Sequence, residues 1–177
     1  MIMKYRIAIL PSAKVSKKAG KLAKQFSRKF PSYFAVDNQK LLPHVTLLVV
    51  DMSANKRSAM LADLGRLLGK QQSLSLSVAK FDSFLGGWFA LKIDNSVRLT
   101  NLRLRLARKL KKYGTIKQKS FRPHITLTKF KQAEDAKIAQ KMMTSPSIKF
   151  DMDTIGVCLS NKYGQVYKII KKFKLKS

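Results

Sequence analysis

The sequence repeats one order of strand-like and helix-like segments, and this duplication limits the fold more than any other feature does. Alternating or continuous apolar residues predict the strands of the first half at 3–10, 42–51 and 73–81. The strands of the second half are predicted at 88–93, 121–130, 148–159 and 163–173. Equivalent segments lie about 80 residues apart, so two unlike copies of one α+β unit are expected.

Four helices are predicted between these strands, because apolar residues recur there at helical spacing. Ser12 is the expected N-cap of the first helix, which a polar loop follows after residue 31. The second helix opens at Ser53 or Asn55. Asp94 or Ser96 caps the third. The fourth is expected at 132–143.

This order predicts an α+β fold of two pseudo-symmetric lobes, each strand-helix-strand-helix-strand, with mainly antiparallel sheets flanking a central groove. A chain of 177 residues is long enough for one domain with its own core, and no Pro-, Gly- or Ser-rich linker separates the halves. We therefore expect a single bilobal domain over residues 1–177. Lobe one is expected over about 1–84 and lobe two over about 85–177.

The charge of the chain predicts a polyanionic partner. It has 37 Lys and Arg residues against 9 Asp and Glu, a formal net charge of +28, and no acidic residue occurs in 1–36 or 95–133. An imbalance of this size attracts polymers of phosphates, whose counterions are released on binding.

Composition also excludes several classes of protein. The longest apolar runs, such as 47–50, are far shorter than the roughly 20 residues of a membrane helix. The start of the chain is typical of a first strand rather than of a signal peptide, so a cytoplasmic protein is expected. The one cysteine, Cys158, cannot form an intramolecular disulfide, and with two histidines it cannot supply a structural zinc site. We expect a buried thiol at Cys158 and no metal.

The two halves share one short motif, PHVTL at 43–47 and PHITL at 123–127, which contains both histidines of the chain. Residues two apart on a strand point to the same face, so each copy presents one imidazole and one hydroxyl together. One imidazole can take a proton from water while the other, protonated, gives one to a leaving oxygen. The threonine hydroxyls can donate to the oxygens of a phosphate between them. A phosphodiester fits this metal-free set best.

These strings, PHVTL and FRPHITL, resemble the paired His-hydrophobic-Thr-hydrophobic signature of the two-histidine (2H) phosphoesterase superfamily. The likeness covers nearly the whole chain, and it includes Leu159-Ser160, Gly164 and Tyr167, which are similar to the family's last hairpin. The nearest branch is that of the bacterial and archaeal 2′-5′ RNA ligase-like proteins, which act as RNA 2′,3′-cyclic phosphodiesterases.

The resemblance implies hydrolysis of a 2′,3′-cyclic phosphate to a 2′-phosphate without a cofactor, with 2′-5′ RNA ligation as the reverse reaction. It implies His44 and His124 as acid and base, and Thr46 and Thr126 as phosphate ligands. His124 is expected to activate water and His44 to protonate the leaving 3′ oxygen, but the symmetry of the motifs lets these roles exchange. Together with the net charge, the resemblance favours an end of tRNA or another structured RNA over a free nucleotide as the substrate. We expect the enzyme to be a monomer.

Two departures from the family pattern bear on substrate fit. Leu48 and Val49 follow the first motif, where close relatives often carry a basic and then an aromatic residue. Lys129 stands where relatives often have arginine, which keeps the charge but loses the bidentate fork. The expected substrate-binding residues are Arg122 and Lys129 for phosphate, and Phe84, Trp88 and Tyr163 for stacking on a terminal base.

Rival functions stay open at this point. The same groups could hydrolyse a 2′-5′ phosphodiester or a small cyclic nucleotide, such as a cyclic phosphate of ADP-ribose. A basic RNA-binding protein with little catalysis would instead depend on the 98–112 helix and not on the histidines.

Overall fold

A computed structural model describes residues 1–117, 120–142, 144 and 146–177. The helices are α1 (Ala13–Lys29), α2 (Arg57–Leu68), α3 (Val97–Leu110) and α4 (Ala133–Met142). The strands are β1 (Ile2–Ile9), β2 (Ser32–Ala35), β3 (Val45–Ser53), β4 (Leu74–Phe84), β5 (Trp88–Ile93), β6 (Gly114–Ile116), β7 (His124–Phe130), β8 (Lys149–Met152), β9 (Thr154–Ser160) and β10 (Val166–Lys174). The four predicted helices are confirmed, and Met143, at the end of the fourth prediction, lies outside the described residues.

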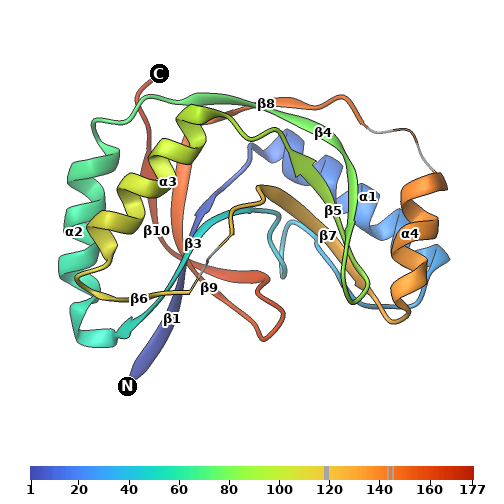
Figure 1. Ribbon diagram of the computed structural model, residues 1–177, viewed down its shortest axis with the longest axis horizontal. Coiled ribbons are helices and arrows are strands. Elements are labelled where there is room, and N and C mark those ends of the chain that lie inside the picture. The colour runs from blue at the N-terminus through green and yellow to red at the C-terminus, as the bar shows by residue number, and fades with distance from the viewer. Residues whose placement is uncertain (118–119, 143, 145) are drawn as a thin grey trace.

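The strands pair along one path, β10-β9-β1-β3-β7-β5-β4-β8, with β2 added to β7 and β6 added to β3. All of these pairings are antiparallel. The sheet curls into a half-barrel, with α2 and α3 at one end of the molecule and α1 and α4 at the other (Figure 1). The α+β prediction is therefore confirmed. No helix among the described residues is long and apolar enough to cross a membrane.

Each half of the sequence contributes elements to both ends of the sheet. β4, from the first half, pairs with β5 and β8, while β9 and β10, from the second half, extend the sheet beyond β1. Two helices also pack on strands of the opposite half. α1, from the first half, packs on β7 as well as β2, and α3, from the second half, packs on β3 as well as β6. This interleaving places the motif strands β3 and β7 side by side at the centre. The division into lobes at about 1–84 and 85–177 stays a prediction.

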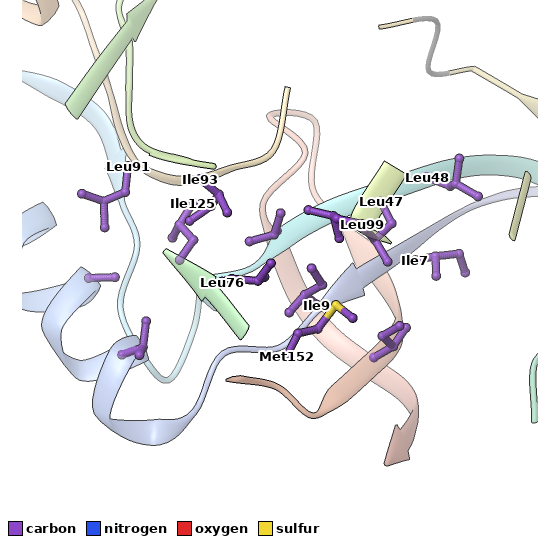
Figure 2. Packing of buried hydrophobic residues seen from close by; sticks show 14 of the residues in the cluster. Ile7, Ile9, Leu47, Leu48, Leu76, Leu91, Ile93, Leu99, Ile125 and Met152 are labelled. Carbon is purple, nitrogen blue, oxygen red and sulfur yellow. The ribbon is translucent and has the colours of Figure 1, made fainter. Parts of the chain in front are cut away.

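Alternation decides which face of each central strand is buried. In β1, Ile7 and Ile9 are fully buried, while Arg6 next to Ile7 is only partly buried and lies on the opposite face. Figure 2 shows Ile7 and Ile9 in the core together with Leu47 of β3 and Ile125 of β7. Burying such side chains contributes about 25 cal/mol per Å² of apolar surface, which holds the motif strands rigidly in place.

Four strands, β2, β6, β8 and β9, differ from the prediction. The predicted strand at 148–159 is two strands, because the chain turns at Asp153 from β8, beside β4, to β9, beside β1. The Asp153 carboxylate accepts hydrogen bonds from Lys174 Nζ at 2.6 Å and from Thr154 Oγ1 at 2.8 Å, which hold this turn. β2 lies in the expected polar loop, and β2 and β6 have four and three residues, too few to show a strand pattern. Cys158 in β9 is a free, buried thiol, as expected.

Ser96 caps α3, since its Oγ accepts a hydrogen bond from the backbone N–H of Leu99 at 3.1 Å. Neither Ser53 nor Asn55 caps α2, because a 3₁₀ turn at Ala54–Lys56 comes first and no side chain caps the helix. We expect Ser96→Ala to lower the free energy of unfolding by about 1 kcal/mol. Ser53→Ala, the matched control, changes it by less than about 0.5 kcal/mol. Urea unfolding measures both, and equal losses would contradict the capping role.

Candidate active site

β3 and β7 carry the two copies of the motif and pair at its central residues. Val45 of β3 lies opposite Ile125 of β7, and both side chains are fully buried. In an antiparallel pair with this register, the residues flanking the pair point to the other face of the sheet. These flanking residues are His44, Thr46, His124 and Thr126. The two motifs are thus related by an approximate two-fold axis between the strands.

The four side chains line one cavity of about 280 Å³. Val49 of β3 and residues from three other parts of the chain complete its wall, namely Arg6 of β1, Phe84 and Trp88, and the turn of Tyr163, Gly164 and Gln165. The Phe84 ring lies against the imidazole of His124, with 5.0 Å between the ring centroids. The interleaved topology therefore brings together both motifs and the last hairpin.

Each imidazole is oriented by a backbone carbonyl two residues earlier. His44 Nδ1 donates to the carbonyl oxygen of Leu42 at 2.9 Å, and His124 Nδ1 donates to that of Arg122 at 2.7 Å. A carbonyl can only accept, so the proton of each neutral ring is on Nδ1. Nε2 of each histidine is then the nitrogen that can accept or deliver a proton.

Burial lowers the pKa of both imidazoles. His44 is only 5% exposed, and its desolvation, with the positive charges of Arg6 and His124, lowers its pKa to about 3. Desolvation and Arg6 also lower the pKa of His124, against the opposing charge of Asp82. Both rings are therefore neutral in the free protein near pH 7. A bound phosphate, being an anion, favours protonation of both.

Arg6 is a site residue absent from the sequence-based predictions. It reaches from β1 into the cavity, where its Nη1 donates a hydrogen bond of 2.6 Å to Oγ1 of Thr46. Gly164 has φ of +73°, which favours glycine, and a Cβ there would lie 2.6 Å from Arg6 Nη2, so the guanidinium would have to shift. The signal in the sequence is an arginine inside an apolar strand, which an exposed strand face explains equally well.

The structure separates the predicted substrate-binding residues into two groups. Phe84, Trp88 and Tyr163 line the cavity, but neither Lys129 nor Arg122 does. The Lys129 ammonium lies over the rings of Tyr33, Trp88 and Tyr163, at 5.3, 5.3 and 5.6 Å from their centroids. Its charge is thus held beside the cavity by cation–π contacts.

Arg122 is placed differently from Lys129. Its backbone carbonyl orients His124, while its side chain is exposed and lines a neighbouring cavity. That Lys129 and Arg122 contact phosphate stays a prediction, and among the described residues Arg6 is the cation that lines the cavity holding the motifs.

A model of the 2′-5′ RNA ligase superfamily matches residues 15–163, which include both motifs. No curated protein matches the chain. Similar folds among solved structures include TT0787 of Thermus thermophilus, with 19% identity, a TM-score of 0.75 and 99% of each chain covered. They also include E. coli LigT complexed with 3′-AMP, with 17% identity, a TM-score of 0.67 and 100% of each chain covered. The PDE domain of MHV ns2 has 16% identity and a TM-score of 0.58, covering 84% of this chain and 99% of that one.

At these identities the solved structures show a shared fold, and the family is shown by the superfamily match. That match spans most of the chain and takes in the β3 and β7 motifs that meet in one cavity. This chain therefore belongs to the 2′-5′ RNA ligase superfamily of two-histidine phosphoesterases.

Proposed function

We propose that the protein is a phosphodiesterase that opens the 2′,3′-cyclic phosphate at the end of an RNA and leaves a 2′-phosphate. The observation that carries this proposal is the convergence of two imidazoles, two hydroxyls and one guanidinium on a cavity of about 280 Å³. Water attacks phosphorus, the P–O3′ bond breaks, and the 3′ oxygen leaves as a hydroxyl. One imidazole takes the proton from water and the other supplies the proton to the 3′ oxygen.

Thr46, Thr126 and Arg6 bind the phosphate in this proposal. The Thr46 oxygen accepts a hydrogen bond from Arg6, so its own O–H is free to donate to a non-bridging phosphate oxygen. Thr126 makes the equivalent donation from the other strand, and the Arg6 cation offsets the phosphate charge. Donors fixed in place before the reaction stabilise the charge that develops at phosphorus.

Each histidine has a separate role in this proposal. We assign His124 as the base that activates water and His44 as the acid that protonates the 3′ oxygen. The approximate two-fold relation of the motifs allows the reverse assignment, and 2′-5′ ligation would run the same steps backwards.

Charge supports an RNA end over a free nucleotide as the substrate. A formal net charge of +28 exceeds what one phosphate needs, whereas a structured RNA such as tRNA neutralises many cations. LigT, a protein of similar fold, has been solved complexed with 3′-AMP and with NADP⁺, which supports a nucleotide ligand here. A monomer acting in the cytoplasm without a cofactor completes the proposal.

The test incubates the protein in EDTA with an RNA that ends in a 2′,3′-cyclic phosphate and identifies the product by its sensitivity to phosphatase and kinase. A 2′-phosphate product, absent with the His44→Ala/His124→Ala variant, supports the proposal. Cleavage of only a 2′-5′ linked RNA or of a small cyclic nucleotide would favour those rival hydrolases. RNA binding that depends on salt, with no cleavage of any substrate, would favour the binding protein.

The pH dependence of the reaction should be bell-shaped, since one imidazole must be neutral and the other charged. The pKa values of both histidines are lowered from about 6.5 in the free protein. The singly protonated form is therefore most populated below pH 6.5, and kcat/KM should reach its maximum there and fall as pH rises. The profile of kcat should lie at higher pH, because bound phosphate raises both pKa values. Rates measured from about pH 4 to about pH 9 test this, and a kcat/KM that climbs steadily across the range contradicts it.

A further inference from the structure

We propose that a second cavity beside the catalytic one binds the nucleotide on the 5′ side of the terminal nucleotide, so that the enzyme prefers an RNA chain to a mononucleotide. This inference rests on the proposed function. The second cavity has a volume of about 390 Å³, and Phe84 belongs to the walls of both cavities. An RNA whose end occupies the first cavity can therefore continue past Phe84 into the second.

Two cationic residues of the second cavity lie next to His124. Lys92 of β5 lies directly opposite His124 of β7 in the sheet, so the two side chains leave the same face. Arg122 is held by the hydrogen bond of 2.7 Å between its carbonyl and His124 Nδ1. Both Lys92 and Arg122 are exposed, and neither forms an ion pair within the part of the chain that the structure describes. Their charges are available to a ligand.

The chemistry of the wall suits a nucleotide with its phosphodiester. Lys92 and Arg122 can bind the phosphate that joins the last two nucleotides, the group that a mononucleotide with a free 5′ hydroxyl lacks. Phe84 and Phe121 offer ring faces to a base, and the Phe121 ring is held by the guanidinium of Arg103 at 5.1 Å. Asp82, the one carboxylate among the described residues of this wall, can accept from a ribose hydroxyl or a base amino group.

The test compares two substrates that differ only in the added nucleotide. One is a nucleoside 2′,3′-cyclic phosphate, and the other is a dinucleotide ending in the same cyclic phosphate. We expect wild-type kcat/KM to be at least about tenfold higher for the dinucleotide. In Lys92→Gln/Arg122→Gln this preference should vanish, because the phosphate that joins the last two nucleotides loses both cations. Arg108→Gln/Lys111→Gln, which removes the same two charge types at exposed positions on another cavity, should keep the preference.

Binding of the 2′-phosphate products gives a second measurement that does not need catalysis. Wild-type protein should bind the dinucleotide product at least about tenfold more tightly than the mononucleotide product, and the Lys92/Arg122 variant should bind both alike. Equal wild-type affinities for the two products, or equal losses in the two double variants, would overturn the second subsite. Failure of the proposed function looks different, because neither cyclic substrate would then be hydrolysed while the binding comparison still decides on the subsite.

Discussion

His44→Ala and His124→Ala should each lower kcat on an RNA 2′,3′-cyclic phosphate by about 10² to 10⁴. Each change removes the Nε2 that accepts or delivers a proton, and both rings face the same cavity. The fold should persist, because each imidazole hydrogen-bonds to a single backbone carbonyl, and the loss of that bond costs about 1 kcal/mol. Steady-state rates measure the loss of activity, and urea unfolding measures the retained stability.

The double variant distinguishes a cooperating pair from two separate contributions. Groups that act as a unit lose most of their effect when either is removed, so His44→Ala/His124→Ala should be little slower than the slower single variant. Single-variant rates within about tenfold of wild type, in folded protein, would end the acid–base proposal.

Arg6→Gln should lower kcat/KM by about 10², because a charge-assisted contact to phosphate is lost and Thr46 loses its donor. The pH profile gives a readout that a structural role would not move. Arg6 lowers the pKa of both histidines, so its removal should shift the maximum of kcat/KM to higher pH. Arg6→Lys keeps the charge without the planar fork, so its kcat/KM should lie between those of the wild type and Arg6→Gln. An unshifted profile in Arg6→Gln would show that its charge does not act on the imidazoles.

Gly164→Ala tests the position of Arg6 by adding a methyl group beside its guanidinium. The added Cβ would meet Arg6 Nη2 at 2.6 Å, so the guanidinium must shift, and we expect this shift to weaken its hydrogen bond to Thr46. Gly86→Ala is the matched control, because Gly86 has a similar φ of +77° but open space around its Cβ position. Both changes should destabilise the protein by about 1 kcal/mol or more through backbone strain. Only Gly164→Ala should reproduce the activity loss and the pH shift of Arg6→Gln, and equal activity in the two variants would contradict this.

Most elements of the fold could be predicted because their signals are local. The cap at Ser96 and the apolar stripes of the four helices depend on residues within a few positions of one another. The errors arise where a strand depends on partners that are distant in the sequence. The break at Asp153 reflects the two different partners of β8 and β9, and β2 and β6 are strands only because β7 and β3 lie beside them.

The candidate site likewise combines features that a local pattern predicts with features that only tertiary contacts decide. The pairing of His44 with Thr46 and of His124 with Thr126 follows from the period of a strand, and both pairs line the cavity. Nothing local places Arg6 against Thr46, since the two are brought together by the pairing of β1 with β3. The position of Arg122 in a neighbouring cavity and the enclosure of Lys129 by three rings are likewise tertiary facts.

By itself, the sequence determined the duplicated α+β order, the face that each motif presents and the net positive charge from which a polyanionic partner is expected, because periodicity and net charge need no knowledge of neighbours. Only the tertiary structure decided that the halves interleave, that Val45 meets Ile125, and which cation enters the cavity. The physical reason is that alternation fixes the face of a side chain but not the strand beside it. Strand neighbours are chosen by packing between segments far apart in the chain, which no local pattern records.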